Sequence, residues 1–337
     1  MSVCVVASVG VRASASKPRE PSSQSSAPPS LISNRRQLLR GGLAAGLCLC
    51  CPPPLAALAQ EAAAPSASSL AASPTILGRA QEVATVADGV GLPPWGYSCL
   101  DGPVNWSGVC ATTGQQSPIN LNYDARFPPA PDRKLSVLAP RFPRFIKAGA
   151  TVKNSGHGTM QVNVPEGIEY ELGPGGQKHR LLQFHFHTPS EHTVDGANLA
   201  MEAHLVHKNL ETGNLAVLGV FIEGGGDLLP NPCIQEALRS APTTPLAETQ
   251  LQRPISLQTL LPKVRTADGM RPYAHYSGSL TTPPCSTGVD WYVFLDPLQI
   301  NPDQVMDFMY FAGAGLKPGV NARPPQPLGD RNVTFFM

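Results

Sequence analysis

The sequence predicts a mainly β fold of the α+β class, in which a single domain holds a large, mostly antiparallel, twisted central sheet and a few short surface helices. Gly, Pro and Asn clusters at close intervals separate short runs that are typical of strands, at residues 159–164, 181–188, 200–208 and 215–223. Helical periodicity is limited to residues 302–311 and 233–240. About 250 residues can bury one large core, so we expect one folded domain.

Alternation along the run 181–188 places functional side chain types on one face. If this segment is extended, Gln183, His185 and His187 project from one side, while Phe184 and Phe186 project from the other. One face is therefore predicted to be buried in the core and the other to carry chemistry.

The first 59 residues predict a cleavable bipartite targeting segment. They are rich in Ser, Ala and Pro and contain six Lys or Arg against one acid, Glu20. Arg35 and Arg36 precede an apolar run at 41–51 that is too short to span a bilayer, and residues 57–59 offer an A-x-A cleavage site. We expect a transit-like part followed by a twin-Arg export signal, together called the leader, then a flexible segment at 60–90 and a folded domain at 91–337.

This order of two targeting signals favours import into an organelle followed by export across an internal membrane. The chloroplast thylakoid lumen fits that order. The alternative is one bacterial or secretory export signal with a long basic region, which would make the protein periplasmic or secreted.

Charge and hydropathy argue against nucleic-acid binding and against a transmembrane segment. Without the leader, 19 basic and 23 acidic residues remain, a formal charge of −4, because six of the 25 basic and one of the 24 acidic residues belong to it. We therefore expect no nucleic-acid binding. Beyond the leader, the sequence contains no stretch apolar enough to predict a transmembrane segment.

Four cysteines remain after removal of the leader: Cys99, Cys110, Cys233 and Cys285. In an exported protein these permit three pairings. They form no CxxC pair, which gives little support to a thiolate zinc site or a thioredoxin-like activity.

Five of the eight histidines fall between residues 185 and 207. His185 and His187 share a strand face, and His204 lies on a segment that could form a neighbouring antiparallel strand. Three imidazoles leave one tetrahedral position open, as a catalytic zinc site requires. A lone H-x-H is more often a solvated strand face, but Gln183 and Glu202 each precede a histidine by two residues and are of the type that orients metal-bound imidazoles.

Eight ordered motifs resemble those of the alpha carbonic anhydrases. They extend from residue 95 to the C-terminus and comprise Trp95-Gly96-Tyr97, Gln116-Ser117-Pro118-Ile119-Asn120, Asn154-Ser155-Gly156-His157, Gln183-Phe184-His185-Phe186-His187, Ser190-Glu191-His192-Thr193-Val194-Asp195-Gly196, Glu202-Ala203-His204-Leu205-Val206-His207, Ser279-Leu280-Thr281-Thr282-Pro283-Pro284 and Asn321-Ala322-Arg323-Pro324. The resemblance implies the fold described above and a zinc-dependent, reversible hydration of CO2 to bicarbonate and a proton.

The resemblance also implies a role for individual residues around a Zn²⁺ ion. The ligands would be His185, His187 and His204, hydrogen-bonded respectively by Gln183, the backbone carbonyl of Asn321 and Glu202. A zinc-bound hydroxide would attack CO2, with Thr281 accepting its proton in a hydrogen bond and donating its own to Glu191.

The resemblance also implies residues that bind the substrate and residues that transfer the proton. The resemblance implies an apolar CO2 pocket formed by Val206, Val217, Leu280, Thr282, Val289 and Trp291. His157 would carry the proton to solvent, with Tyr97 and Asn154 ordering the intervening water. Ser155 and Met160 depart from the family pattern, because they stand where related enzymes often carry Asn. His192 is expected to be a buried hydrogen-bonding group near Glu191.

The resemblance further implies a disulfide between Cys110 and Cys285, and cis peptide bonds at Ser117-Pro118 and Pro283-Pro284. Whether Cys99 and Cys233 form a second bridge is left open.

Two non-enzymatic alternatives are a carbonic anhydrase-related binding protein and a metal-storage protein that uses the histidine cluster. The first would be expected to lack metal ligands, whereas all three histidines are retained here. The second would have no use for the Thr281 and Glu191 pair. Association with a thylakoid photosynthetic complex is a hypothesis, and the sequence does not predict an oligomeric state or the physiological direction of the reaction.

Overall fold

The structure is a computed structural model of the chain. It describes residues 95–112, 114–122, 142–146, 149–167, 169–172, 177–226, 228–263, 271–314 and 319–336. The chain divides into two units, residues 1–60 and 61–337, and the fold below belongs to the second. The predicted targeting segment 1–59, including Arg35 and Arg36, and the predicted flexible segment 60–90 lie outside the described residues.

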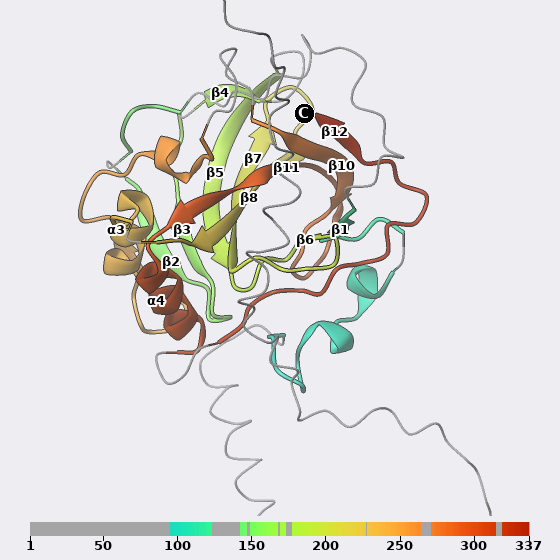
Figure 1. Cartoon of the computed structure of the whole chain (residues 1–337), viewed down its shortest axis with the longest axis horizontal. Coiled ribbons are helices and arrows are strands. Elements are labelled where there is room, and N and C mark those ends of the chain that lie inside the picture. The colour runs from blue at the N-terminus through green and yellow to red at the C-terminus, as the bar shows by residue number, and fades with distance from the viewer. Residues whose placement is uncertain are drawn as a thin grey trace, which may run out of the picture. The chain divides into compact units, whose positions relative to one another are not determined.

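One large twisted sheet dominates this unit (Figure 1). Its strands lie in the order β12 (Thr334–Phe336), β10 (Tyr273–Ser279), β11 (Thr287–Ile300), β8 (Leu215–Gly224), β7 (Met201–Asn209), β5 (Gln177–His187), β3 (Met160–Asn163), β2 (Thr151–Asn154) and β9 (Glu248–Gln250), with β4 (Glu169–Leu172) paired to β5. Within this sheet all described pairs are antiparallel except β8 with β11. The predicted mostly antiparallel sheet is confirmed.

The remaining elements are short. A separate parallel pair joins β1 (Asn120–Leu121) to β6 (Thr193–Val194). Helices α3 (Pro232–Ser240) and α4 (Pro302–Ala312) match the two predicted helical segments, and the 3-10 turns are η2 (Pro103–Asn105), η3 (Gly108–Ala111) and η5 (Leu257–Leu260). No described helix combines the length and apolar character needed to span a membrane.

Both α-helices start at an Asn-Pro pair. Asn231 accepts hydrogen bonds from the backbone amides of Cys233 and Ile234, and Asn301 accepts one from Asp303. Proline follows each cap at the first helical position, where no intrahelical N–H bond is required. These local signals fix where each helix begins. The two helices contact each other and lie beside the sheet (Figure 1).

The sheet separates two apolar clusters because neighbouring residues along a strand face opposite sides. Leu205 and Leu218 belong to the larger cluster, which also contains Phe184, Phe186 and Phe308 of α4. Their neighbours Val206 and Val217 belong to the second cluster on the other face. The second face is the one that carries the histidines predicted to bind metal.

Candidate metal centre

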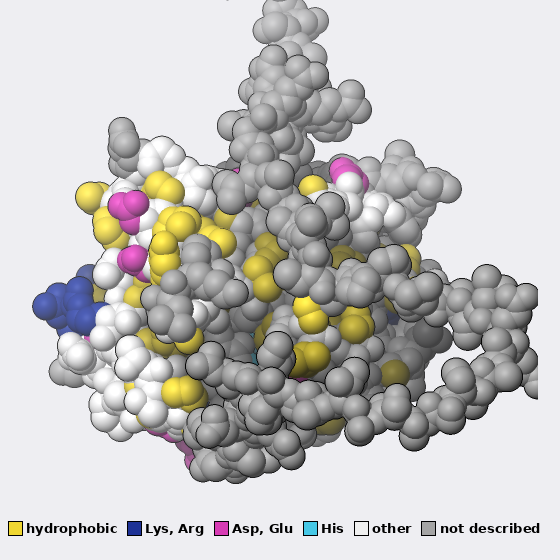
Figure 2. Space-filling model, turned by 90° about the horizontal axis from the view of Figure 1, so that it is seen from below, with side chains coloured by type: hydrophobic (Ala, Val, Ile, Leu, Met, Phe, Trp, Pro, Cys, Tyr) yellow, Lys and Arg dark blue, Asp and Glu magenta, His cyan; other side chains and the backbone are white. Residues whose placement is uncertain are grey.

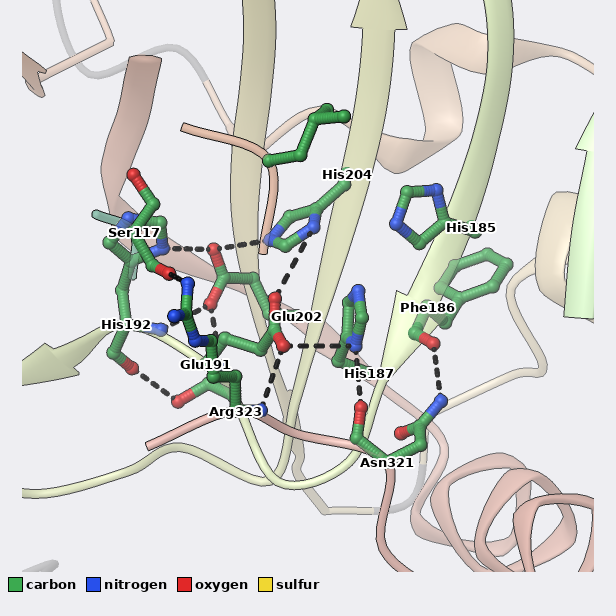
Figure 3. A network of polar contacts seen from close by, with 12 residues as sticks. Ser117, His185, Phe186, His187, Glu191, His192, Glu202, His204, Asn321 and Arg323 are labelled. Carbon is green, nitrogen blue, oxygen red and sulfur yellow. Dashed lines mark hydrogen bonds and ion pairs between the residues drawn. The ribbon is translucent and has the colours of Figure 1, made fainter. Parts of the chain in front are cut away.

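Three histidines converge on one face of the sheet. His185 lies opposite His204 in the register of β5 and β7, and His187 follows His185 on the same face. Their candidate ligand nitrogens all lie within 4.8 Å of one another. Figure 3 shows the three rings turned toward a common point from two adjacent strands. His187 and His204 are buried, whereas His185 is partly exposed.

Each of these rings uses its other nitrogen in a hydrogen bond, as predicted. Nδ1 of His185 donates to Gln183 Oε1 at 2.8 Å, and Nδ1 of His187 donates to the backbone carbonyl of Asn321 at 2.7 Å. For His204 the roles are reversed, because Nε2 donates to Glu202 Oε1 at 3.0 Å. These partners leave Nε2 of His185 and His187 and Nδ1 of His204 with free lone pairs directed at the centre.

The protonation states suit a metal site. Burial lowers the pKa of all three rings, to about 4 for His187 and well below the ordinary value for His185, whose neighbours His187 and His204 lower it further. The rings are therefore neutral at pH 7, the state in which imidazole binds a metal. Nε2 of His187 is buried and has no hydrogen-bond partner among the described residues. A cation bound to these nitrogens would satisfy that buried atom, so the donor set fits a tetrahedral metal with one open position.

Glu202 accepts hydrogen bonds with both of its carboxylate oxygens from residues around the three histidines. Oε1 accepts from His204 and, at 2.7 Å, from Nδ1 of His192, and Oε2 accepts from the backbone amides of Glu191 and His192. Burial alone would raise the pKa of Glu202, but His192 and His204 hold it well below the usual range. The carboxylate is therefore ionised and fixes the ring of His204.

Gly219 of β8 faces the same group. It lies opposite His204 in register, and a Cβ at this position would lie 3.0 Å from Glu202 Oε1. The missing side chain leaves the space that the carboxylate occupies.

His192 is a buried structural histidine, as expected. Its Nε2 lies 2.7 Å from the hydroxyl of Tyr276, which donates in turn to Ser117 Oγ at 2.9 Å. Ser117 Oγ also accepts from the backbone amide of Ser279. This chain of hydrogen bonds links Glu202 to the segment that leads into Thr281.

Thr281 and Glu191 are both buried beside the three histidines. Glu191 Oε1 accepts from the backbone amide of Arg323 at 2.9 Å, and its Oε2 lies 3.8 Å from Nδ1 of His204. Burial raises the pKa of Glu191 to about 7, opposed by His204, by the Arg323 amide and by hydrogen bonding with the Thr281 side chain. A cation at the centre would favour the ionised carboxylate.

An apolar surface adjoins this polar group. Val206, Val217, Val289 and Trp291 are buried in one cluster, and the partly buried Leu280 packs against them. The Trp291 ring lies 4.8 Å from the His204 ring, between ring centres. The structure therefore brings five of the six predicted pocket residues together, and Thr282 lies partly exposed two residues after Leu280.

His157 lies in the turn between β2 and β3 and stacks on Trp95. The two ring centres are 3.6 Å apart and the planes meet at 14°. Burial lowers the pKa of His157, while Asp101 and a hydrogen bond with the Trp95 backbone raise it. Its Nε2 has no hydrogen-bond partner among the described residues. Tyr97 also packs against Trp95, and its hydroxyl is buried.

Asn154 and Met160, both close to His157 in the sequence, make contacts that the sequence did not predict. The Asn154 amide lies 3.2 Å from the carbonyls of both Pro242 and Thr243, and its oxygen accepts from Gly156 N. This side chain therefore holds the turn that carries His157, and its water-ordering role stays a prediction.

Met160 is fully buried in the larger core cluster, on the opposite face from the histidines. The next residue, Gln161, pairs with His185 in register and therefore projects from the histidine face. Gln161 was not among the predicted site residues. The alternation of apolar Met160 and Val162 with polar Gln161 and Asn163 could have predicted which of these residues face the histidines.

The predicted disulfide is present between Cys110 and Cys285, with Cα atoms 5.0 Å apart. Cys233 is buried in the core and Cys99 is exposed, and they do not form a second bridge with each other. The predicted cis bonds at Ser117-Pro118 and Pro283-Pro284 are observed, together with one at Thr188-Pro189 that was not predicted.

Arg323 joins the segments around this bridge. Its guanidinium donates to the backbone carbonyls of Cys110 and Ser117 and to Gln116 Oε1, at 2.7 to 2.9 Å. On the face seen from below, hydrophobic side chains are prominent among the described residues and histidine shows as only a small area (Figure 2).

The chain is similar to known proteins of a single family. A family model for eukaryotic-type carbonic anhydrases matches residues 101–337. The solved structure of carbonic anhydrase Cah3 from Chlamydomonas reinhardtii, in complex with acetazolamide, is 47% identical, with a TM-score of 0.65 over 73% of this chain and 100% of that chain.

Bacterial enzymes are also similar. The carbonic anhydrase of Pectobacterium carotovorum is 32% identical over 247 residues, which cover 71% of this chain and 89% of the relative. That of Neisseria gonorrhoeae is 35% identical over 246 residues, covering 71% and 86%. The chain therefore belongs to the alpha carbonic anhydrases, and it catalyses the reversible hydration of CO2 to bicarbonate and a proton.

Proposed function

We propose that His185, His187 and His204 hold a catalytic Zn²⁺ ion. The support is that three neutral imidazoles present free lone pairs within 4.8 Å of one another, each oriented by a hydrogen bond from its second nitrogen. When bound, zinc lowers the pKa of a water molecule to about 7, the value familiar from carbonic anhydrases themselves, and so supplies a nucleophile near neutral pH.

Thr281 and Glu191 would orient that nucleophile. The ionised Glu191 carboxylate accepts the hydroxyl proton of Thr281, which leaves the threonine oxygen able only to accept a hydrogen bond from the attacking oxygen. Anions with no proton to donate would be disfavoured at this position.

The apolar cluster beside Thr281 would receive CO2. The molecule carries no net charge and forms few hydrogen bonds, so a surface made by Val206, Val217 and Trp291 suits it better than a polar wall would. Leu280 and Val289 complete this surface, with Thr282 at its partly exposed edge.

His157 would carry the product proton to solvent. The residue is partly exposed, its buried Nε2 has no hydrogen-bond partner among the described residues, and burial lowers the pKa of the ring while Asp101 raises it. Histidine is the side chain best suited to exchange protons near neutral pH. Tyr97 packs against Trp95, and burial raises the pKa of its phenol, with Glu191 raising it further and Arg323 lowering it. We propose that Tyr97 borders the proton path.

The observation that carries this proposal is the matched set of three rings and three acceptors. Replacing His185 by Ala should abolish both bound zinc and CO2 hydration, measured by elemental analysis and stopped flow. Thr281→Ala should retain zinc but lose activity. His275→Ala, on β10 and outside the ligand set, is the matched control and should retain both. Full activity in His185→Ala would contradict the ligand assignment.

We also propose that the enzyme works in the chloroplast thylakoid lumen and associates there with a photosynthetic complex. The support is the basic, acid-poor leader with Arg35 and Arg36, and the similarity to an algal enzyme. A fluorescent fusion that keeps the leader should accumulate in the lumen, and replacing both arginines by Lys should stop the second transfer. Secretion of the fusion, or its delivery to a periplasm, would favour the alternative export signal.

A further inference from the structure

Asn321 uses all its polar atoms, and they connect the metal centre to the turn that carries His157. Its backbone carbonyl accepts from His187 Nδ1 at 2.7 Å, and its backbone amide donates to Thr188 O at 3.0 Å. The side-chain oxygen accepts from Thr188 N at 2.7 Å. The side-chain amide lies 3.0 Å from three acceptors, Gly158 O, Thr159 Oγ1 and Phe186 O. The fully buried Asn321 thus contacts both the C-terminal end of β5 and the turn that carries His157.

The turn at residues 154–159 fixes the position of His157. Ser155 N donates to Thr159 O at 2.9 Å, and His157 N donates to Ser155 Oγ at 3.1 Å. Gly156 and Gly158 both have positive φ, 82° and 70°. The backbone of His157 therefore follows wherever the Gly158 and Thr159 side of the turn is held.

A second contact holds the same side of the turn. The C-terminal end of α4 packs against Gly158, where a Cβ would lie 2.6 Å from the backbone oxygen of Ala312. Gly158 is therefore confined between α4 and the amide of Asn321. This contact offers a way to displace the turn without changing the residue that touches His187.

We propose that the Asn321 side chain is a positioning residue for proton transfer, which holds His157 at a fixed place relative to the metal ligand His187. The inference rests on the proposed role of His157 as the proton carrier. Its physical basis is that Asn321 contacts both the end of the strand that carries His187 and the turn that carries His157. The distance between these two histidines therefore does not vary with independent movements of the strand and the turn. Displacements of about 1 Å can cost an enzyme about 100-fold in rate.

The kinetic test separates proton transfer from the chemical step. Asn321→Ala keeps the backbone carbonyl that accepts from His187 but removes the amide that holds Gly158 and Thr159. At low buffer concentration we expect kcat to fall by about tenfold to 100-fold, clearly more than kcat/KM for CO2 measured on the zinc-loaded variant. A high concentration of imidazole should restore kcat, because a small base in solution replaces the misplaced histidine.

A second readout does not depend on the bound metal. In the metal-free whole chain, NMR signals of the His157 ring carry the ring-current shift of the stacked Trp95. Asn321→Ala should move or broaden these signals. Asn209→Ala is the matched control: this side chain accepts from Glu211 and Thr212 amides in the turn between β7 and β8, so its loss should leave the His157 signals in place.

Gly158→Ala tests the same proposal from the other side of the turn and decides the matter if Asn321→Ala fails to fold. It should give the same low kcat, imidazole rescue and shifted His157 signals. Equal losses of kcat and kcat/KM with loss of zinc would overturn the proposal and leave Asn321 with a purely structural role. Unchanged kcat and unchanged His157 signals would also overturn it. A zinc-loaded wild type that does not hydrate CO2 would contradict the proposed function, while the NMR comparison would still test the positioning.

Discussion

Removing the Cys110–Cys285 bridge by a double replacement with Ser should destabilise the fold substantially. The bridge closes a loop with a sequence separation of 175. In the chain-entropy treatment of disulfides, a loop of that length corresponds to about 5 kcal/mol of unfolding free energy at 25 °C, an upper figure. For a domain of this size each kcal/mol is worth about 2 to 4 °C, so the melting temperature should fall by at most roughly 10 to 20 °C.

Polar contacts around the bridge reduce this loss. The carbonyl of Cys110 still accepts from Arg323 at 2.7 Å, and the carbonyl of Cys285 from Gln116 at 3.2 Å. Cys285 N also donates to Thr282 O at 2.8 Å, which couples the bridge to the loop that carries Thr281. Activity should therefore fall along with stability, because the loop loses its covalent anchor.

Thermal unfolding and stopped-flow hydration, each with and without a thiol reductant, measure both effects. The oxidised wild type should lose stability and activity on reduction, whereas the double variant should not respond. Cys99→Ser, at an exposed position outside the bridge, should respond like the wild type. If reduction left the melting temperature and the activity unchanged, the reasoning about loop closure and about the Thr281 segment would both be refuted.

Three further changes have defined outcomes. Gly219→Ala should push against Glu202 Oε1 and lower zinc affinity about 10-fold to 100-fold, measured by competition with a chelator; unaltered affinity would contradict the role of Glu202. His207 has a pKa lowered by burial to about 3, against about 6.5 unfolded, so its neutral form stabilises the fold above pH 6.5 and this stability is lost as pH falls toward 3. Urea unfolding at pH 7 and pH 5 should therefore show that His207→Gln removes about 2 kcal/mol of acid sensitivity. Val217→Phe should keep zinc but lower kcat/KM about tenfold or more by filling the apolar surface, and normal kcat/KM would place CO2 elsewhere.

Local patterns predicted the strands and the grouping of the three histidines well. The alternation around His185 and His187 sets which side chains share a face, and apolar Phe184 and Phe186 determine which face enters the core. His204 could be added because an antiparallel neighbour brings residues far apart in sequence directly opposite each other. Asn231 and Asn301, each followed by Pro, mark both helix starts in the sequence itself.

Contacts made by turns and by long-range packing could not be predicted in the same way. A one-residue difference in the turn after His157 decides whether Met160 or Gln161 faces the site, and motif spacing alone does not resolve it. The side-chain contacts of Asn154 and Asn321 depend on carbonyls that lie 88 and 163 residues away in the chain. No local pattern encodes such partners, because the amide of Asn has no preference among backbone oxygens.

The separation of 134 residues between His187 and Asn321 has a consequence for biosynthesis. The carbonyl that orients His187 and the guanidinium that joins Cys110, Gln116 and Ser117 both come from a segment that leaves the ribosome long after the histidine strands. A nascent chain can therefore form much of the sheet while its histidines still lack one orienting acceptor. Stable metal binding should require synthesis to pass residue 321, and ribosome-stalled chains ending before it should retain little zinc.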